Sequence, residues 1–298
     1  MTAGLDFDAW MRTVQATVEQ ALDVYLPAET VHPARLHAAM RYATLDGGKR
    51  VRPLLVFAAG ALFDADAAAL ARAAAAVEMI HAYSLVHDDM PCMDDDALRR
   101  GKPTVHVHYD QATALLVGDA LQAQAFDILA AGEIADAART LAMVRVLAHA
   151  SGSVGMCGGQ AIDLASVGMP LSLAELEQMH QLKTGALLRA AVLLGALAGK
   201  ALSSAEHTAL NRYAQAIGLA FQVVDDVLDA TADSATLGKT AGKDAADNKP
   251  TYVSTLGLAP SQALAQQLRN DAHEALAHFG NDARRLRELA DLIVQRKA

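Results

Sequence analysis

The sequence predicts an all-α protein, and three observations support this fold class. Alanine is abundant throughout the 298 residues, aromatic residues make up only 4%, and few segments look rich in strand-forming residues. Alanine and leucine favour helices, whereas β-branched and aromatic residues favour strands. Apolar residues, 53% of the chain, recur at helical spacing and are numerous enough to bury a large core. No internal repeat or linker divides the chain, so we expect one domain over residues 1–298.

The N-terminal half is predicted to consist of successive helices separated by short turns. Pro27 ends the first helix, and the loop Asp46-Gly47-Gly48 separates the second from the third. Pro53 suits the first turn of that third helix because proline lacks the N–H that a first turn leaves unpaired. The expected helices span residues 5–26, 36–45, 53–63, 66–89, 110–131 and 133–151.

The C-terminal half is predicted to contain longer helices and one polar loop. The glycine-rich stretch 152–159 indicates a kink or a close contact between helices. Helices are then expected over residues 173–199, 205–229, 261–279 and 282–296. The segment 233–249 carries glycines and lysines, which favours a loop that can close over a site.

Composition excludes several classes of function. A net charge of −9 argues against nucleic acid as a partner. Two cysteines do not form a disulfide framework, and the N-terminus lacks a signal-peptide pattern, so we expect a cytoplasmic protein. Arg72, Glu78, His81 and Arg189 interrupt the longest apolar runs, so no membrane span is expected.

Two aspartate clusters stand out, HDDMPCMDDDALRRGK at residues 87–102 and FQVVDDVLD at residues 221–229. Both lie in apolar, helix-like surroundings, where carboxylates are costly unless their charge is compensated. Mg²⁺ usually binds one or two carboxylates together with substrate phosphates. We therefore expect the clusters to hold two or three Mg²⁺ ions around a diphosphate, although Mn²⁺ also suits carboxylates.

Helix geometry predicts how each cluster is arranged. Asp225 and Asp229 are four residues apart and therefore share one helix face. Asp88 and Asp94 are six apart, which does not suit one face of a straight helix. Because Pro91 removes a backbone donor and clashes with the preceding turn, we expect the helix to end near Met90 and the chain to bring Asp94 back beside Asp88.

Basic residues near the clusters are candidates for binding phosphate. Arg99 and Arg100 are adjacent and point in different directions, so they could serve two phosphates. Three further cations follow the Gly-Gly loop and could form a second anion site near a helix start, namely Lys49, Arg50 and Arg52. Lys183 interrupts an apolar helix and is either a phosphate ligand or a snorkelling side chain.

The sequence allows two interpretations of the role of each of three further polar residues. Asp163 either faces the site or pairs with a nearby cation. The terminal Arg296 and Lys297 either fold over a bound substrate or are frayed and solvated.

The ordered motifs GGKRVRP, HDDMPCMDDDALRRGKPT, GGQAIDL, KTGALLRAA, FQVVDDVLD and LGKTAGKDAADNKPTY carry a family resemblance. From about residue 41 to the C-terminus the chain resembles bacterial-type short-chain trans-isoprenyl diphosphate synthases, most of all those that form farnesyl diphosphate. The resemblance implies a bundle of mostly antiparallel helices around a deep apolar cavity, and a homodimer. It also implies that isopentenyl diphosphate condenses with allylic diphosphates, dimethylallyl and geranyl, by ionisation, condensation and elimination.

The same resemblance assigns roles to residues of this chain. The implied metal ligands are Asp88, Asp89, Asp94, Asp225, Asp226 and Asp229. The implied contacts to the allylic diphosphate are Arg99, Lys183, Thr184, Gln222, Lys239 and Lys249, and the isopentenyl diphosphate site is Lys49, Arg52, His81 and Arg100. Catalytic roles fall to Lys183, Gln222 and Arg99, while the released diphosphate is expected to take the proton.

Product length is expected to depend on the depth of the cavity. Tyr83 and Ser84 lie about one helical turn before Asp88, on the side facing the growing chain. By resemblance, an aromatic residue at this position accompanies a fifteen-carbon product, which favours farnesyl diphosphate. Geranyl or geranylgeranyl diphosphate synthases remain alternatives. A terpene cyclase or a non-catalytic subunit fits less well, because both aspartate motifs are intact.

Overall fold

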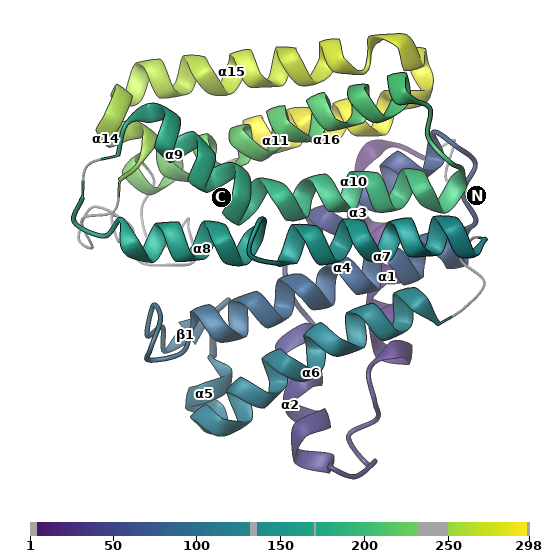
Figure 1. The fold of residues 1–298 in the computed structure, drawn as a ribbon, viewed down its shortest axis with the longest axis vertical. Coiled ribbons are helices and arrows are strands. Elements are labelled where there is room, and N and C mark those ends of the chain that lie inside the picture. The colour runs from purple at the N-terminus through teal and green to yellow at the C-terminus, as the bar shows by residue number, and fades with distance from the viewer. Residues whose placement is uncertain (1–4, 132–135, 170, 232–249, 297–298) are drawn as a thin grey trace.

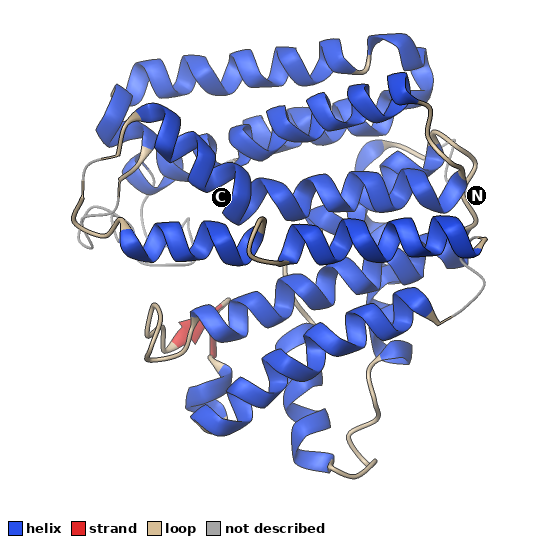
Figure 2. Cartoon of the chain, in the orientation of Figure 1, coloured by secondary structure: helices blue, strands red, loops and turns tan. Residues whose placement is uncertain are grey.

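Helices make up nearly all of the described structure (Figure 2). The computed structural model describes residues 5–131, 136–169, 171–231 and 250–296. Within these ranges the strands are a single short hairpin, β1 (Leu98–Arg99) and β2 (Lys102–Pro103). The predicted all-α fold is therefore confirmed.

The N-terminal helices begin close to where the sequence predicts them, except for one short helix at Val105–His108 that was not predicted. They are α1 (Phe7–Tyr25), α2 (Ala34–Thr44), α3 (Val51–Ala61), α4 (Ala67–Asp88), the short α5 (Val105–His108), α6 (Gln111–Ala130) and α7 (Ala137–Ser151). Aspartate side chains cap several of them. Asp66, for example, accepts hydrogen bonds from the backbone N–H groups of Ala68 and Ala69. Such caps satisfy donors that the first helical turn cannot pair internally.

The C-terminal helices differ from expectation in several places. They are α8 (Met156–Ala165), α9 (Leu173–His180), the π-helix η1 (Gln181–Gly185), α10 (Ala186–Gly199), α11 (Ser204–Thr231), α14 (Tyr252–Leu256), α15 (Leu258–Ala275), the 3₁₀-helix η2 (Ala277–Ala283) and α16 (Arg284–Gln295). Helix α8 was not predicted, because its glycines indicated a kink or a close contact between helices. Helix α14 was not predicted either, and the helix expected over residues 261–279 is α15, which begins at Leu258 and ends at Ala275. The predicted helix 173–199 is interrupted by the π-helical turn.

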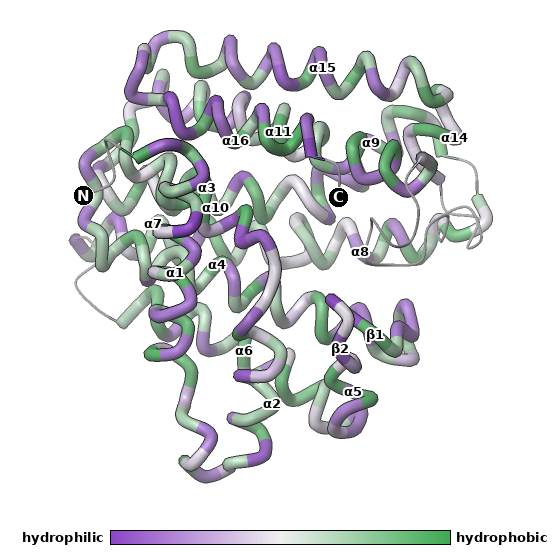
Figure 3. Tube along the Cα trace, turned by 180° about the vertical axis from the view of Figure 1, so that it is seen from behind, coloured by the Kyte–Doolittle hydropathy of each residue, from purple (hydrophilic) through white to green (hydrophobic). Residues whose placement is uncertain are grey.

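The helices stack in successive layers, from α15 at one edge of the molecule through α11, α10, α7 and α4 to α6 and α2 at the other (Figure 1). Alanine faces allow close packing, since every residue from Ala73 to Ile80 in α4 is buried. Helices α3 and α10 meet backbone to backbone, because a Cβ atom on Gly195 would lie 2.1 Å from the carbonyl oxygen of Val56. Hydrophilic and hydrophobic segments alternate along the outer helix α15, as expected for a helix with one exposed face (Figure 3).

Two helical stretches, Ala67–Asp88 and Leu173–Gly199, are long and apolar enough to cross a membrane by length and composition alone. Most of each stretch is buried inside the bundle. Packing in the protein core therefore accounts for their apolar character.

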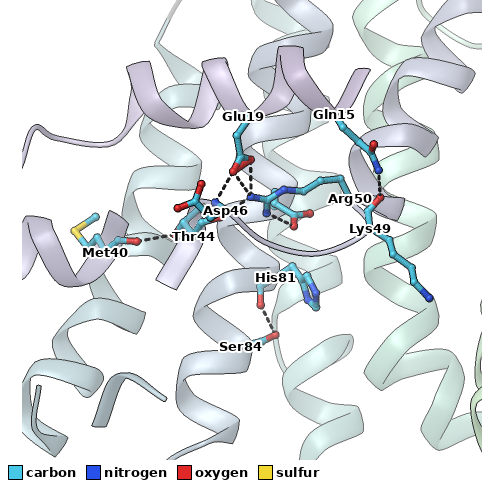
Figure 4. A network of polar contacts seen from close by, with 10 residues as sticks. Gln15, Glu19, Met40, Thr44, Asp46, Lys49, Arg50, His81 and Ser84 are labelled. Carbon is cyan, nitrogen blue, oxygen red and sulfur yellow. Dashed lines mark hydrogen bonds and ion pairs between the residues drawn. The ribbon is translucent and has the colours of Figure 1, made fainter. Parts of the chain in front are cut away.

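A buried ion pair joins the loop before α3 to helices α1 and α4 (Figure 4). Arg50 donates hydrogen bonds to Glu78 and Glu19, each at 2.7 Å, and to the carbonyl oxygen of Thr44. The side chains of Arg50 and Glu78 are only 3% and 4% exposed. Arg50 is thus a structural residue and not part of an anion site, whereas its neighbour Lys49 extends away from this network.

Replacing Arg50 with methionine is expected to lower the free energy of unfolding by about 3–5 kcal/mol, because it leaves the buried charge of Glu78 unpaired. Urea unfolding would measure this. The control Arg35→Met removes the exposed pair with Asp110 and should cost less than about 1 kcal/mol. Equal effects of the two substitutions would show that the buried pair contributes nothing specific.

Candidate functional site

The first aspartate cluster turns back on itself as the sequence predicts. Helix α4 ends at Asp88, and the backbone N–H of Asp94 donates a hydrogen bond to the carbonyl oxygen of Asp88 at 2.9 Å. The position of Pro91 therefore produces the expected return of Asp94 beside Asp88. Asp89 takes a different direction from its neighbour. Its buried carboxylate accepts hydrogen bonds from Nε and Nη2 of Arg99, the shortest at 2.6 Å.

The second cluster lies near the C-terminal end of α11. Asp226 is buried and accepts hydrogen bonds from the Gln222 side chain and from the backbone N–H of Tyr252, each at 2.8 Å. Asp226 thereby attaches the start of α14 to α11. Asp225 pairs with Arg296, and Asp229 is buried on the same helix.

The carboxylates have the chemistry of a divalent-cation site. Burial, together with repulsion from Asp94, raises the pKa of Asp88 to about 6. Asp229 has a buried Oδ1 atom without a hydrogen-bond partner in the described structure. A nearby cation would relieve both conditions.

These carboxylates do not form a preformed metal cage. Across the residues that the structure describes, no three acidic, histidine or cysteine side chains converge as a potential metal site. Mg²⁺ commonly completes its coordination with water and substrate phosphates. The arrangement therefore fits a metal ion that arrives together with a diphosphate.

A cluster of cations surrounds His81 on α4. Burial, with added repulsion from Arg100, lowers the pKa of Arg52 to about 10. The pKa values of Lys49, Arg100 and His81 are also lowered, mainly by desolvation and to a smaller extent by neighbouring cations. An anion placed among these groups would remove the repulsion. The structure thus gathers Arg52, His81 and Arg100, three of the four residues that the resemblance assigns to the isopentenyl diphosphate site, whereas the cation that acts on the fourth, Lys49, is Arg296.

The Gly47-Gly48 turn makes room for Arg100. A Cβ atom on Gly47 would lie 2.0 Å from Nη1 of Arg100, and Gly48 has a φ of +74°, which favours glycine. The guanidinium therefore lies against this turn. In this way the loop before α3 and the hairpin after the first aspartate cluster are brought to one place.

Lys183 and Thr184 lie in the π-helical turn, and their side chains contact α8 and α11, respectively. Nζ of Lys183 donates a hydrogen bond to Oδ2 of Asp163 at 2.6 Å, so Asp163 pairs with a cation, one of its two predicted readings. The hydroxyl of Thr184 lies 3.5 Å from Oε1 of Gln222. Lys183 also opposes the rise in the pKa of Asp88, which places its ammonium near the first aspartate cluster.

An apolar cavity of about 470 Å³ adjoins these charged groups. Asp88, Lys183 and Arg52 contribute to its lining, together with Tyr83 and Ser84 from α4. A second wall comes from α8, through residues that the sequence did not indicate, namely Met156, Cys157, Gln160, Ala161 and Leu164. The hydroxyl of Tyr83 lies 3.7 Å from Sγ of Cys157, so tyrosine and cysteine meet across the cavity.

The C-terminal Arg296 belongs to the same region. Its Nη2 donates hydrogen bonds to Oδ1 of Asp225 and to the carbonyl oxygen of Phe221, each at 2.8 Å. The guanidinium lies 3.9 Å from the centre of the Phe221 ring, and the side chain is only 10% exposed. Arg296 is therefore not a frayed terminal residue. The predicted site residues Lys239 and Lys249, the loop that carries them and Lys297 lie outside the described residues.

Comparison with known proteins places this geometry in context. A family model described as polyprenyl synthetase matches residues 33–284. The chain is 53% identical over 285 residues to "Probable farnesyl diphosphate synthase" of Sinorhizobium fredii, covering 95% of this chain and 86% of that protein. It is 46% identical over 298 residues to farnesyl diphosphate synthase of Escherichia coli, covering 98% and 99%.

A solved structure gives the same picture. The crystal structure of an FPP/GFPP synthase from Zymomonas mobilis matches with a TM-score of 0.88 and 44% identity, and the match covers 97% of this chain and 98% of that one.

Proposed function

The chain belongs to the polyprenyl synthetase family, and we propose that it condenses isopentenyl diphosphate with dimethylallyl and then geranyl diphosphate to give farnesyl diphosphate. One observation carries this proposal. Beside a single apolar cavity, carboxylates with a raised pKa lie near cations with lowered pKa values. The carboxylates suit a diphosphate that brings metal ions, and the cations suit a second diphosphate that brings none.

We assign Asp88, Asp94, Asp225 and Asp229 as the residues that would hold two or three Mg²⁺ ions, with Mn²⁺ as a possible substitute. When bound, Mg²⁺ would neutralise charge on the departing diphosphate. Asp226 belongs to the same metal motif, but it accepts hydrogen bonds from the Gln222 side chain and from the Tyr252 backbone. We therefore also assign it a structural role, which is to attach α14 to α11.

The resemblance also implies Asp89 as a metal ligand, but its carboxylate is paired with Arg99. We therefore assign Asp89 to the orientation of that arginine. The pair uses Nε and Nη2 of the guanidinium and leaves Nη1 for a phosphate oxygen. Paired hydrogen bonds of this kind fix the plane of an arginine. Asp89 thus orients Arg99 toward the allylic diphosphate. The other residues assigned to bind this diphosphate are Lys183, Thr184, Gln222, Lys239 and Lys249.

The reaction then follows from the positions of the charges. Lys183 and Arg99 stabilise the negative charge that develops as the carbon–oxygen bond of the allylic diphosphate breaks. The apolar cavity holds the allylic cation away from water, which limits its hydrolysis. The double bond of isopentenyl diphosphate, held by Lys49, Arg52, His81 and Arg100, attacks this cation. The released diphosphate accepts the proton that the adduct loses, and Gln222 stabilises the cationic intermediates.

The experiment that tests the function is a product assay. Purified protein would be incubated with Mg²⁺, labelled isopentenyl diphosphate and either dimethylallyl or geranyl diphosphate, and the dephosphorylated alcohols would be separated by length. A dominant fifteen-carbon alcohol from both starters is expected. Diphosphate release without condensation, or a cyclic hydrocarbon, would overturn the proposal.

A longer product is the second candidate function. The Zymomonas mobilis structure is described as an FPP/GFPP synthase, so that relative's description names two products. In this chain the buried Tyr83 side chain lines the cavity, and we propose that it limits the length of the product, which favours the shorter one.

Replacing Tyr83 with alanine is expected to shift the main product from fifteen to twenty carbons, because the change removes an aromatic ring from the lining of the cavity. The alcohols from the product assay measure this. Tyr83→Phe keeps the ring and should retain the fifteen-carbon product. Unchanged farnesyl diphosphate from the alanine variant would refute Tyr83 as the floor.

The pair between Arg296 and Asp225 predicts competition with the metal ion. A cation cannot use Oδ1 of Asp225 while Arg296 holds it, so Arg296→Ala is expected to bind Mn²⁺ about fivefold more tightly in the presence of inorganic diphosphate. The free-Mn²⁺ signal in electron paramagnetic resonance measures this. Arg284→Ala, which removes an exposed pair with Glu288, is the control. Weaker Mn²⁺ binding would show instead that Arg296 holds Asp225 in place for the metal.

We further propose a cytoplasmic homodimer. Leu115, Leu116 and Leu141 on helices α6 and α7 are each about half or more exposed, with fractions of 49%, 54% and 60%. Leu115 also lines the cavity, so a second copy covering this face would complete its wall. Light scattering coupled to size exclusion measures the mass, and a monomer at micromolar concentration would contradict the dimer.

A further inference from the structure

Lys183 leaves its helix at an irregular turn. The five residues Gln181–Gly185 form a π-helix between α9 and α10. A π-helical turn contains one residue more than the α-helical turn it replaces, and such turns are frequent at functional sites. Here the extra residue widens the helix where Lys183 and Thr184 meet the cavity.

Helix α8 is shaped to receive this turn. A Cβ atom on Gly159 would lie 2.1 Å from the backbone nitrogen of Lys183 and 2.5 Å from its Cα. Backbone atoms cannot rotate away as a side chain could, so only glycine permits this approach. Gly159 therefore allows α8 and the Lys183 turn to touch.

One helical turn further along α8, Asp163 receives the lysine side chain. The distance from Nζ of Lys183 to Oδ2 of Asp163 is 2.6 Å, and Asp163 is only 8% exposed. A carboxylate this buried is costly without a cationic partner. Gly159 and Asp163 are four residues apart and therefore lie on the same face of α8. Gly159 contacts the backbone of Lys183, and Asp163 binds its ammonium group.

We propose that Asp163 is a positioning residue for the prenyl transfer, acting through Lys183. Lysine has four rotatable side-chain bonds and loses more rotamer freedom than most residues when it is held in one place. Because the pair with Asp163 already orders the lysine side chain in the free protein, the side chain does not have to be ordered when substrate binds. The ammonium is then fixed beside the cavity, near Asp88, where charge develops on the allylic diphosphate.

This inference rests on the proposed function and makes a specific prediction for kinetics. Asp163→Asn is expected to lower kcat about 10- to 100-fold, because a displaced catalytic cation commonly costs this much. KM for isopentenyl diphosphate should change less than about twofold, because Lys183 is assigned to the allylic diphosphate. Asp163→Glu keeps the charge and should recover part of the loss.

A double-mutant cycle tests whether Asp163 acts through Lys183. The kcat values of wild type, Asp163→Asn, Lys183→Ala and the double variant would be compared with geranyl diphosphate as starter. With Lys183 already removed, Asp163→Asn is expected to lower kcat less than about twofold further. An equal loss in both backgrounds would overturn the proposal, as would full activity of Asp163→Asn.

Two further measurements keep this test decisive. Thermal unfolding should show Lys183→Ala less stable than the double variant, because the single change leaves the Asp163 charge buried without its partner. Asp291→Asn removes a carboxylate that pairs with Arg269 and His273 on the outer helices, and should leave kcat within about twofold. If wild type forms no prenyl product the proposed function fails, whereas wild-type product with an additive cycle refutes only the role of Asp163.

Discussion

Asp88→Asn is expected to lower kcat/KM for geranyl diphosphate about 10³-fold. Asparagine preserves the shape of the side chain but removes its negative charge, which would weaken the binding of the Mg²⁺ ions that we propose here. The burial that raises the pKa of Asp88 to about 6 also makes this carboxylate depend on a cation. Steady-state kinetics at several Mg²⁺ concentrations would measure the loss, which excess Mg²⁺ should only partly reverse.

Asp95 offers a matched control within the same loop. It is exposed, and its φ of 51° lies in a region that asparagine tolerates well. Asp95→Asn should therefore retain kcat/KM within about twofold. If Asp88→Asn kept more than a tenth of wild-type kcat/KM, the first cluster would not hold an essential metal ion.

Arg100→Met is expected to raise KM for isopentenyl diphosphate about 10- to 100-fold while leaving KM for geranyl diphosphate within about twofold. Arg100 is seated on the Gly47-Gly48 turn, and its pKa is lowered by desolvation and by nearby arginines. A bound diphosphate would relieve that repulsion, and a hydrogen bond between charged groups contributes about 1.5–3 kcal/mol. Initial rates with each substrate varied in turn would separate the two KM values.

Lys102→Met is the control for this substitution. Lys102 is exposed on β2, two residues after Arg100, and has no assigned role. Its removal subtracts one positive charge from the same hairpin and should change neither KM more than about twofold. Equal effects on both substrates in Arg100→Met would place Arg100 in a shared anion site and contradict its assignment.

The sequence was sufficient where the determining interactions are local. Helical spacing and prolines predicted the helices of the N-terminal half other than α5, and α4 ends at Asp88, three residues before Pro91. The return of Asp94 to Asp88 also followed from Pro91 alone, because proline acts on the preceding turn of its own helix. The grouping of Lys49, Arg52, His81 and Arg100 came from the family motifs, and the structure brings three of them together, Arg52, His81 and Arg100.

Local patterns failed where a distant element supplies the reason. The glycines of 152–159 indicated a kink or a close contact between helices, and Gly159 does lie against the backbone of Lys183, but the sequence did not indicate that α8 runs through Gly158 and Gly159. The π-helical turn likewise lies inside an apolar run whose periodicity predicted a regular helix.

What the sequence by itself determined is the helical class, the order of the elements and the two carboxylate clusters, since these depend on residues near one another in the chain. What only the tertiary structure decided is which charge meets which. Asp89 pairs with Arg99, Asp163 with Lys183 and Asp225 with Arg296, whereas Arg50 is buried against Glu78. Three of these four pairs join different helices or a helix and a distant segment, and the fourth closes a hairpin onto α4. Such partners come within hydrogen-bonding distance only once the helices pack, because the energy of a buried charge depends on its surroundings in space rather than on its neighbours in sequence.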